Sequence, residues 1–307
     1  MTEKPLVSVI INCYNGGKYL REAIDSVIAQ TYENWELVFW DNQSTDSTRE
    51  IMESYGDSRI HYFYAPEHTP LGEARNLAMN KINGLFFSFL DADDLWLCTF
   101  LERAVSVLVN SDYVGYYCNY IDLYNHTEKI HNTELISSQR TMRDIVNYYN
   151  IGMSGVVLNY QTIKENGIMF QEKYNLIEDL DFYTHVTSNG NLYYDSTPLI
   201  KYRCHAGSTT YLRATEWSRE YMDYLSDMRE NFIPKGLIDE KDLWRIKKVA
   251  FASKVEAVIQ NDDKKGFVKL FVKSPKYIFS YWRNLLYLLI GKESFLKIRY
   301  RRNFVNR

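Results

Sequence analysis

Paired cysteines and long apolar runs are both missing from this sequence. Its four cysteines lie far apart and form no Cys-x-x-Cys pair; they are Cys13, Cys98, Cys118 and Cys204. This spacing argues against a zinc ribbon or a disulfide framework and favours a reducing compartment. No stretch reaches the roughly 18 uninterrupted apolar residues of a membrane-spanning helix. The polar start, Met1 to Pro5, leads directly into a strand pattern, so we expect no signal peptide.

Glycine-rich nucleotide loops are missing as well. Gly16-Gly17-Lys18 follows a predicted strand, but the upstream glycine of a phosphate loop is absent and Tyr19 replaces its Ser or Thr. The Gly-x-Gly-x-x-Gly pattern of dinucleotide-binding proteins is absent too. The net charge of −3 argues against a general nucleic-acid binder. A phosphate bound by this chain would therefore need a metal ion, rather than a glycine loop, to neutralise it.

A cluster of acids directly follows an apolar run in the first third of the chain. The run Leu85–Leu90 reads as a buried strand, and Asp91, Asp93 and Asp94 come next. Because burying an unpaired charge is costly, such acids need a partner. Mg²⁺ and Mn²⁺ are usually held by one or two carboxylates together with substrate phosphates. We therefore predict a site for a metal–phosphate substrate; the alternative is that Asp94 caps a helix beginning near Leu95-Trp96.

Strand and helix patterns alternate up to this acid cluster. Predicted strands at Val7–Ile11, Trp35–Trp40 and Ile60–Tyr64 are separated by amphipathic helices, and Ser44 is a candidate N-cap with Asp46 placed for the helix dipole. This order predicts an α/β fold with a doubly wound, mostly parallel sheet. Ligands bind at the carboxyl ends of such strands. One crevice is therefore expected to gather the residues that follow three of them: Asn12 to Asn15, Asp41-Asn42, and Asp91 to Asp93.

The patterns change along the rest of the chain. Between residues 113 and 212 strands and helices are mixed, and beyond about residue 212 only helix patterns remain. We predict a catalytic domain over residues 1–212, with a nucleotide-binding half (1–112) and an acceptor-side half (113–212). A helical region would follow over residues 213–307, with helices at Glu216–Asn231, Glu240–Gln260, Gly266–Val272 and Ile278–Ile290.

Six short blocks together make a family recognisable. The blocks are Val7 to Asn15, Asp41 to Asp46, Ala74 to Asn76, Leu90 to Asp94, Glu178 to Asp181, and Tyr202 to Ser208. With these blocks in this order, the chain resembles the inverting family two glycosyltransferases, which have the GT-A fold, over roughly residues 6 to 210. The family usually has a second acid where this chain has Asn42, and a glycine where it has Gln43, so the nucleotide stays open.

The resemblance implies a role for individual residues. Asp41 would accept a hydrogen bond from the base, usually uracil, Arg75 would contact the nucleotide, and Asp91 would lie near the ribose. Asp93 would bind Mn²⁺ or Mg²⁺ directly, and His205 would contact the metal or the diphosphate. The same crevice would include Asn12, Tyr14, Asn15 and Ala92.

The resemblance also implies a general base. Asp179 matches the family carboxylate that takes the proton of the acceptor hydroxyl, a role typically worth ~10²–10⁴-fold in rate. Asp181 is the competing residue. Two positions further along a helix it would lie on another side, where it would serve the N-terminus of that helix.

The last segment of the chain is basic and aromatic. From Lys264 to Arg307 there are twelve Lys and Arg residues and one acid, Glu293. A basic amphipathic helix can lie in a membrane interface, and a polybasic segment gains about 1 kcal/mol per Lys or Arg near an anionic surface. We predict that residues 264–307 bind an anionic membrane surface. Helices packed on the core and an oligomer contact are the alternatives, and no nucleic-acid partner is expected.

These observations lead to one expected function and two rivals. We expect an inverting, metal-dependent hexosyltransferase that moves a sugar from a nucleoside-diphosphate sugar, with UDP favoured, to a glycan or lipid-linked glycan of a bacterial surface polysaccharide. We expect it in the cytoplasm, peripheral at the inner face of the membrane. A nucleotidyltransferase would need a glycine-rich, basic loop, which Asn12–Gly17 does not supply. A catalytically silent membrane adaptor would have no need of Asp41, Asp91, Asp93 and Asp179.

Overall fold

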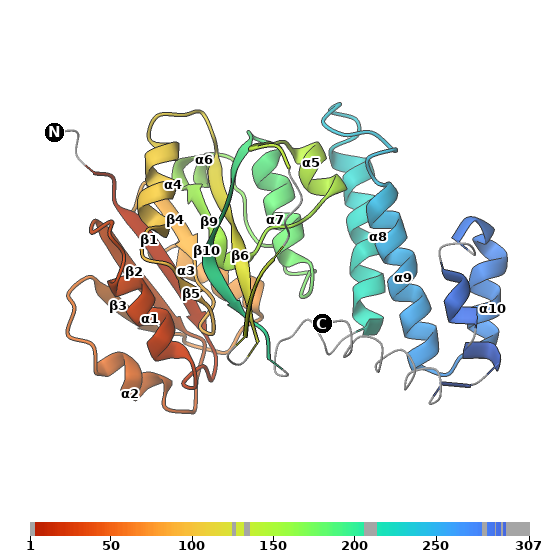
Figure 1. Cartoon of the computed structure of the whole chain (residues 1–307), viewed down its shortest axis with the longest axis horizontal. Helices are drawn as coiled ribbons and strands as arrows, with labels where there is room; N and C mark the ends of the chain where they lie inside the picture. Colours follow the sequence, from red (N-terminus) through yellow and green to blue (C-terminus); the bar gives the residue numbers. More distant parts are fainter. Residues whose placement is uncertain are drawn as a thin grey trace.

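A computed structural model describes residues 4–124, 127–131, 136–205, 214–277, 281–285, 287–289 and 291–292. One mixed sheet forms its centre, in the order β3-β2-β1-β4-β9-β6-β10-β5, with β7 paired to β6 and β8 to β10 (Figure 1). The strands are β1 Val7–Cys13, β2 Trp35–Asp41, β3 Ile60–Tyr64, β4 Phe86–Phe89, β5 Leu95–Trp96, β6 Gly115–Tyr124, β7 Thr127–Ile130, β8 Gln139–Arg140, β9 Val156–Asn159 and β10 Leu192–Arg203.

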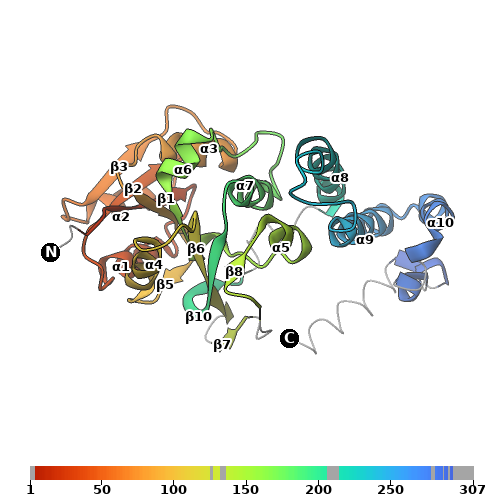
Figure 2. The same ribbon diagram turned by 90° about the horizontal axis from the view of Figure 1, so that it is seen from above.

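Helices cover both faces of this sheet. Figure 2 shows α1 Leu20–Ile28 and α4 Phe100–Leu108 on one side, and α3 Leu71–Met79, α6 Tyr160–Glu165 and α7 Glu178–Thr187 on the other. Alternate strand residues point to opposite faces, so Val9 joins the first hydrophobic core and its neighbour Ile10 joins the second. The predicted doubly wound α/β fold is confirmed.

The predicted parallel pairing is found among the N-terminal strands and once more further along the chain. β1 is parallel to both β2 and β4, β2 is parallel to β3, and β6 is parallel to β10. β9, however, runs antiparallel to both of its neighbours, β4 and β6. The sheet is therefore mixed as a whole, and its N-terminal parallel part carries the predicted nucleotide crevice.

Local interactions differ from the prediction at two places. The helix after β2, α2 Thr48–Glu53, begins later than expected, and Asp46 rather than Ser44 accepts the Thr48 amide, at 3.0 Å. Leu95-Trp96 forms β5 and no helix, so Asp94 caps none. In both cases the side chain that we expected to cap a helix bonds instead to a residue distant in the sequence. The Asn15 backbone amide donates a hydrogen bond to the Ser44 hydroxyl, and the Ser154 hydroxyl donates one to the Asp94 carboxylate.

Further helices pack beside the sheet domain. α8 Ala214–Asn231 and α9 Trp244–Gln260 share a hydrophobic cluster with α5 Met142–Asn147 and α7, and α10 Lys264–Lys273 packs on α9 (Figure 1). The predicted helix Ile278–Ile290 lies partly outside the described residues; within it Trp282–Leu285 forms a 3-10 helix. Short 3-10 helices also occur at Met153–Gly155 and Pro275–Tyr277. Residues 293–307, which include the end of the predicted basic tail, lie outside the described part.

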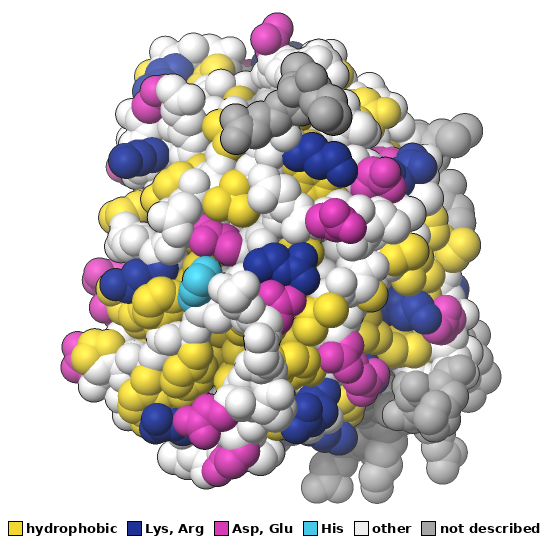
Figure 3. All heavy atoms as spheres, turned by 90° about the vertical axis from the view of Figure 1, so that its left-hand side faces the viewer, with side chains coloured by type: hydrophobic (Ala, Val, Ile, Leu, Met, Phe, Trp, Pro, Cys, Tyr) yellow, Lys and Arg dark blue, Asp and Glu magenta, His cyan; other side chains and the backbone are white. Residues whose placement is uncertain are grey.

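The domain surface beside β2 and β3 has mixed charge. Figure 3 shows acidic and basic side chains interspersed there, with hydrophobic side chains between them. Among the described residues, no helix is both long enough and apolar enough to cross a bilayer.

Candidate active site at the carboxyl ends of the parallel strands

The parallel strands bring three of the predicted segments to one edge of the sheet. Cys13 at the end of β1 pairs with Asp41 at the end of β2, and the Asn42 amide donates to the Cys13 carbonyl at 2.8 Å. On the other side of β1, the Leu90 amide donates to the Ile10 carbonyl at 2.9 Å, directly before the acid cluster. The expected crevice edge is therefore formed by neighbouring strand ends.

Hydrogen bonds connect the loops after β1 and β2. Asn15 has a φ of 55°, in the left-handed region that Asn tolerates, and its Oδ1 accepts the Thr45 amide at 2.8 Å. The Gly17 amide donates to Asp46 Oδ2 at 2.9 Å, and a Cβ on Gly17 would come within 2.5 Å of Ser47 Oγ. Close contact between the two loops therefore explains why residue 17 is a glycine, without any phosphate-binding role.

The three nucleotide-side residues differ in how accessible they are. Asp41 is fully buried, and its oxygens accept the Ser44 amide and the Tyr62 hydroxyl, each at 2.7 Å. A nucleobase would therefore have to share or displace one of these donors. Tyr14 is 55% exposed and lies on the His68 ring, with centroids 4.4 Å apart. The side-chain amide atoms of Asn12 are buried and have no hydrogen-bond partner among the described residues.

Arg75 joins the acid cluster to the start of α7. It is only 4% exposed; its Nη2 lies 3.4 Å from Asp91 Oδ1, and its Nη1 lies 3.1 Å from Glu178 Oε1. Burial raises the pKa of Asp91, and the Arg75 charge opposes that rise. One buried guanidinium thus connects residues 91 and 178, which come from the two halves of the predicted catalytic domain.

The first turn of α7 contains two neighbouring carboxyl groups, Glu178 and Asp179, whose pKa values are raised. Burial raises the pKa of Glu178 to about 7, Arg75 opposes the rise and Asp179 adds to it. Burial also raises the pKa of Asp179, while the Tyr149 hydroxyl and the Leu180 amide oppose that rise. A carboxylate with a raised pKa is a stronger base than an ordinary aspartate. Asp179 therefore has the character that the predicted role requires, and the role itself stays a prediction.

Asp181 has different surroundings from Asp179. It is fully buried, and neither of its carboxylate oxygens has a hydrogen-bond partner among the described residues. His185 Nε2 is 3.7 Å from Oδ1. Burial raises the pKa of Asp181 to about 7. The expected role of Asp181 at the N-terminus of α7 has no support in its contacts, because among the described residues its carboxylate accepts no amide of that turn.

Asp93 faces the predicted histidine. His205 Nε2 lies 2.8 Å from Asp93 Oδ2, with the two side chains 29% and 36% exposed. Between Asp91 and Asp93, the Ala92 Cβ lies 3.3 Å from the position that a Cβ on Gly16 would take, so it packs under the loop after β1. Among the described residues no group of three or more His, Cys, Asp or Glu side chains is arranged to hold a metal.

Neighbouring residues hold the acid cluster in place. Asp94, buried with its pKa raised well above its usual range by burial, accepts the Ser154 hydroxyl at 2.6 Å and the Arg203 amide at 2.9 Å. Arg203 Nε donates to the Asp93 carbonyl at 2.8 Å. Ser154 could not be predicted from the sequence, because the residue lies far from the cluster along the chain and belongs to no motif. Arg203 lies in a recognised block but had no assigned role.

The sequence is similar to a family of glycosyltransferases and to a bacterial glucosyltransferase. A sequence model described as "Glycosyl transferase family 2" matches residues 8–164. A relative from Escherichia coli, UDP-Glc:alpha-D-GlcNAc-diphosphoundecaprenol beta-1,3-glucosyltransferase WfgD, is 30% identical over 229 residues, or 74% of this chain and 87% of the relative.

Solved structures share the fold. TarS of S. aureus, residues 1–349 in complex with UDP-GlcNAc, is similar with a TM-score of 0.67 and 18% identity, covering 86% of this chain and 79% of TarS. The mannosyltransferase PcManGT of Pyrobaculum calidifontis in complex with GDP-Man and Mn²⁺ has a TM-score of 0.55 and 17% identity, covering 100% of this chain and 89% of PcManGT. At these identities the likeness shows the fold alone, which is GT-A.

Proposed function

Because the chain belongs to glycosyltransferase family 2, we propose that it is an inverting hexosyltransferase that uses a nucleoside-diphosphate sugar, with UDP the favoured nucleotide. The acceptor would be a hydroxyl of a glycan or lipid-linked glycan in surface polysaccharide biosynthesis, as the name of the E. coli relative suggests. The observation that carries the proposal is the Arg75 bridge. It connects Asp91, on the donor side, to Glu178, next to the base Asp179.

The side chains at Asp93 fit a divalent ion. The partly exposed Asp93 carboxylate offers one oxygen ligand, and the His205 imidazole offers one nitrogen ligand. Mn²⁺ and Mg²⁺ take few protein ligands when substrate phosphates supply the remaining oxygens, so a site with two side chains is sufficient. We therefore propose that Asp93 and His205 hold Mn²⁺ or Mg²⁺. When bound, the ion would neutralise charge on the leaving diphosphate.

The proposed reaction is a single displacement. The acceptor oxygen forms a bond to the anomeric carbon while the bond from that carbon to the phosphate oxygen breaks, and its electron pair leaves with the nucleoside diphosphate. Asp179 takes the proton of the acceptor hydroxyl. Arg75 is placed to hold Asp91 on the donor side and Glu178 beside the base. No protein nucleophile is needed, and the anomeric configuration inverts.

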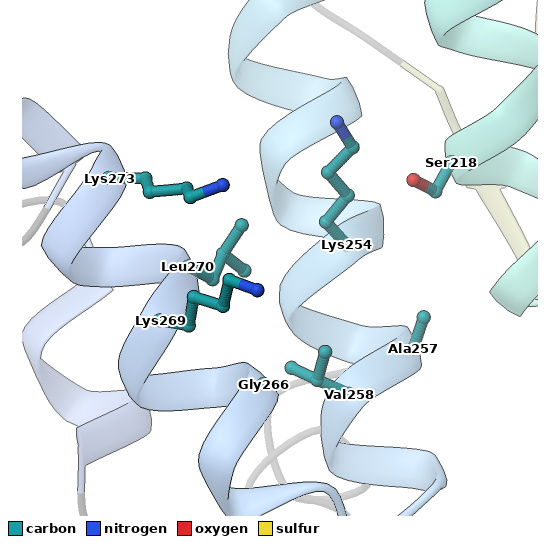
Figure 4. Close-up of a pocket in the computed structure, with 8 residues that line it drawn as sticks. All are labelled: Ser218, Lys254, Ala257, Val258, Gly266, Lys269, Leu270 and Lys273. Atoms are coloured by element: carbon teal, nitrogen blue, oxygen red, sulfur yellow. The ribbon is translucent and has the colours of Figure 1, made fainter.

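The helices at the end of the described chain support a second part of the proposal. α10 exposes Val268 (48%) and Val272 (73%) next to lysines. A groove of ≈ 310 Å³ between α9 and α10 is lined by Lys254, Lys269 and Lys273, and Figure 4 shows the amino groups of Lys269 and Lys273 extending from α10 toward α9. Apolar side chains interleaved with cations suit an anionic lipid surface. We therefore propose that the protein is cytoplasmic and peripheral at the inner face of the membrane.

Product analysis tests the proposed reaction. The protein would be incubated with Mn²⁺, a panel of nucleotide sugars and a lipid-diphosphate-linked sugar acceptor. We expect release of the nucleoside diphosphate and a new glycosidic bond whose anomeric configuration, read by NMR, is opposite to that of the donor. Release of pyrophosphate would instead indicate nucleotidyl transfer. Absence of any product or donor hydrolysis with the whole panel, with or without manganese, would support a silent adaptor.

A further inference from the structure

A carboxylate from α8 holds the segment that leads into α7. Glu220 is fully buried, and its Oε1 accepts the Asn175 amide at 3.0 Å. Its Oε2 accepts the amides of Leu176 at 2.9 Å and Ile177 at 3.2 Å. Ile177 is the N-cap residue of α7 and supplies no side-chain cap. Glu220 therefore supplies, from another helix, an acceptor for the amide of the N-cap residue and for the two amides that precede it.

The same face of α8 makes a second contact with the segment that leads into α7. Asp227 lies seven residues after Glu220, or about two turns, and hence on the same side of α8. It accepts hydrogen bonds from the Lys173 ammonium and the Tyr174 hydroxyl. Residues 173–177 are thus held by two carboxylates of α8, directly before the two acids of the predicted active site.

Electrostatic effects place α8 close to those acids. The charge of Glu220 adds to the rise in the pKa of Glu178. Conversely, after burial, the charge of Asp179 is the largest cause of the raised pKa of Tyr221, the residue that follows Glu220. An anion beside the first turn of α7 is also favoured by the helix dipole.

We propose that Glu220 is a positioning residue for sugar transfer: by holding the amides of residues 175–177, it fixes Asp179 relative to Arg75 and the bound donor. This inference rests on the proposed function, in which Asp179 is the base. It assigns the helices after the sheet domain a part in the reaction, because α8 supplies the group that orients the base. A small misplacement of a catalytic group can lower a rate about 100-fold.

Two substitutions at Glu220 and one control on the same helix test the inference. Glu220→Gln keeps the size of the side chain but turns one acceptor oxygen into an NH₂ group that faces an amide N–H. Glu220→Asp keeps the charge but withdraws the carboxylate by one methylene. Glu230→Gln is the control, because the Glu230 carboxylate is exposed and, within the described part of the chain, accepts a hydrogen bond only from Ser226 of the same helix.

Three readouts on the full chain separate positioning from general loss of structure. For Glu220→Gln we expect kcat at least ~10-fold lower, with the donor KM and the Mn²⁺-dependent UDP affinity unchanged. Hydrogen exchange should become faster in residues 175–179. Glu220→Asp should give smaller changes in the same direction, and Glu230→Gln should match the parent protein in all three readouts.

Several results would overturn the inference. Unchanged exchange in residues 175–179 would do so, as would faster exchange with a normal kcat. A fall in UDP affinity parallel to that in kcat would indicate a structural role only. If the parent protein transferred no sugar from any donor, the proposed function would fail, whereas the exchange data would still show whether Glu220 holds the segment.

Discussion

Arg75 is a buried cation whose two terminal nitrogens face carboxylates from different parts of the chain. Its exposure of 4% means that solvent cannot replace either partner. Losing one partner of such a group costs far more than losing a surface ion pair, because the other charge stays buried. A planar guanidinium can face Asp91 and Glu178 at once, whereas a single ammonium cannot do so in the same geometry.

Arg75→Lys tests this bridge. We expect kcat/KM for transfer to fall roughly 10- to 100-fold, because the lysine keeps the charge but loses one of the two contacts. Steady-state kinetics with the donor varied would measure the change. Arg49→Lys is the matched control, since Arg49 pairs with Glu53 on the surface with 63% of its side chain exposed. Equal activity of the two variants would argue against the bridge.

Asp179→Asn tests the base. The amide is similar in shape but cannot accept a proton, so we expect transfer to fall at least ~100-fold while donor affinity stays intact. Transfer would be followed by release of the nucleoside diphosphate and donor affinity by calorimetry. Near-normal turnover would move the base elsewhere, and Asp181→Asn would then be the next variant to measure.

At the scale of helices and strands, local pattern predicts most elements but not the contacts that place them. β3 has the predicted bounds, and α10 contains the whole of the predicted helix Gly266–Val272. The misplaced caps at Ser44 and Asp94 have one physical cause. Their partners, Asn15 and Ser154, come from other segments, and a local pattern contains no information about distant partners.

The same limit applies to the candidate site. Motifs placed Asp91, Asp93 and His205 at one edge, and the structure brings Asp93 and His205 into contact. The pairing of Arg75 with Glu178 spans 103 positions along the chain, so it could not be derived from spacing. The contact of Glu220 with the segment before α7 was missed for the same reason, since the pattern of residues 216–231 predicts a helix but not what that helix contacts.

Asp181 makes the stability of the folded protein depend on pH. Burial raises its folded-state pKa to about 7, above its ordinary value of 3.8, so the folded protein binds this proton more tightly than the unfolded chain. Its contribution to stability is therefore greatest at low pH and is lost as pH rises from about 4 towards 7.

Asp181→Asn should remove this dependence. We expect the variant to be more stable than the parent at pH 8, by on the order of 2–4 kcal/mol, and nearly equal at pH 4. Urea denaturation at both pH values would measure the difference. The control is Asp112→Asn, at an exposed acid, which should have little effect at either pH. A stability difference independent of pH would contradict the assignment.

At the scale of the whole molecule, charge is unevenly distributed. The protein carries a net charge of −3, yet the groove between α9 and α10 has three lysines around it, none with an ion pair among the described residues (Figure 4). A surface of this kind attracts anions over about a Debye length, so its effect should weaken with salt.

Vesicle binding tests the proposed membrane contact. We expect cosedimentation with phosphatidylserine vesicles, little with phosphatidylcholine, and release as salt rises from 0.1 to about 0.5 M. Changing Lys269 and Lys273 to Glu should weaken binding markedly. The same change at Lys129 and Lys164, exposed lysines of β7 and α6, is the control. Equal binding to both lipids would contradict an electrostatic contact.

We propose above that a divalent ion at Asp93 binds the diphosphate of the donor where the parallel strands end. Calorimetric titration of UDP into the protein, with and without Mn²⁺ and repeated with Asp93→Ala, tests this claim. We expect binding that requires Mn²⁺ in the parent protein and is lost in the variant. UDP binding of equal strength in both proteins, or without any dependence on manganese, would contradict the claim.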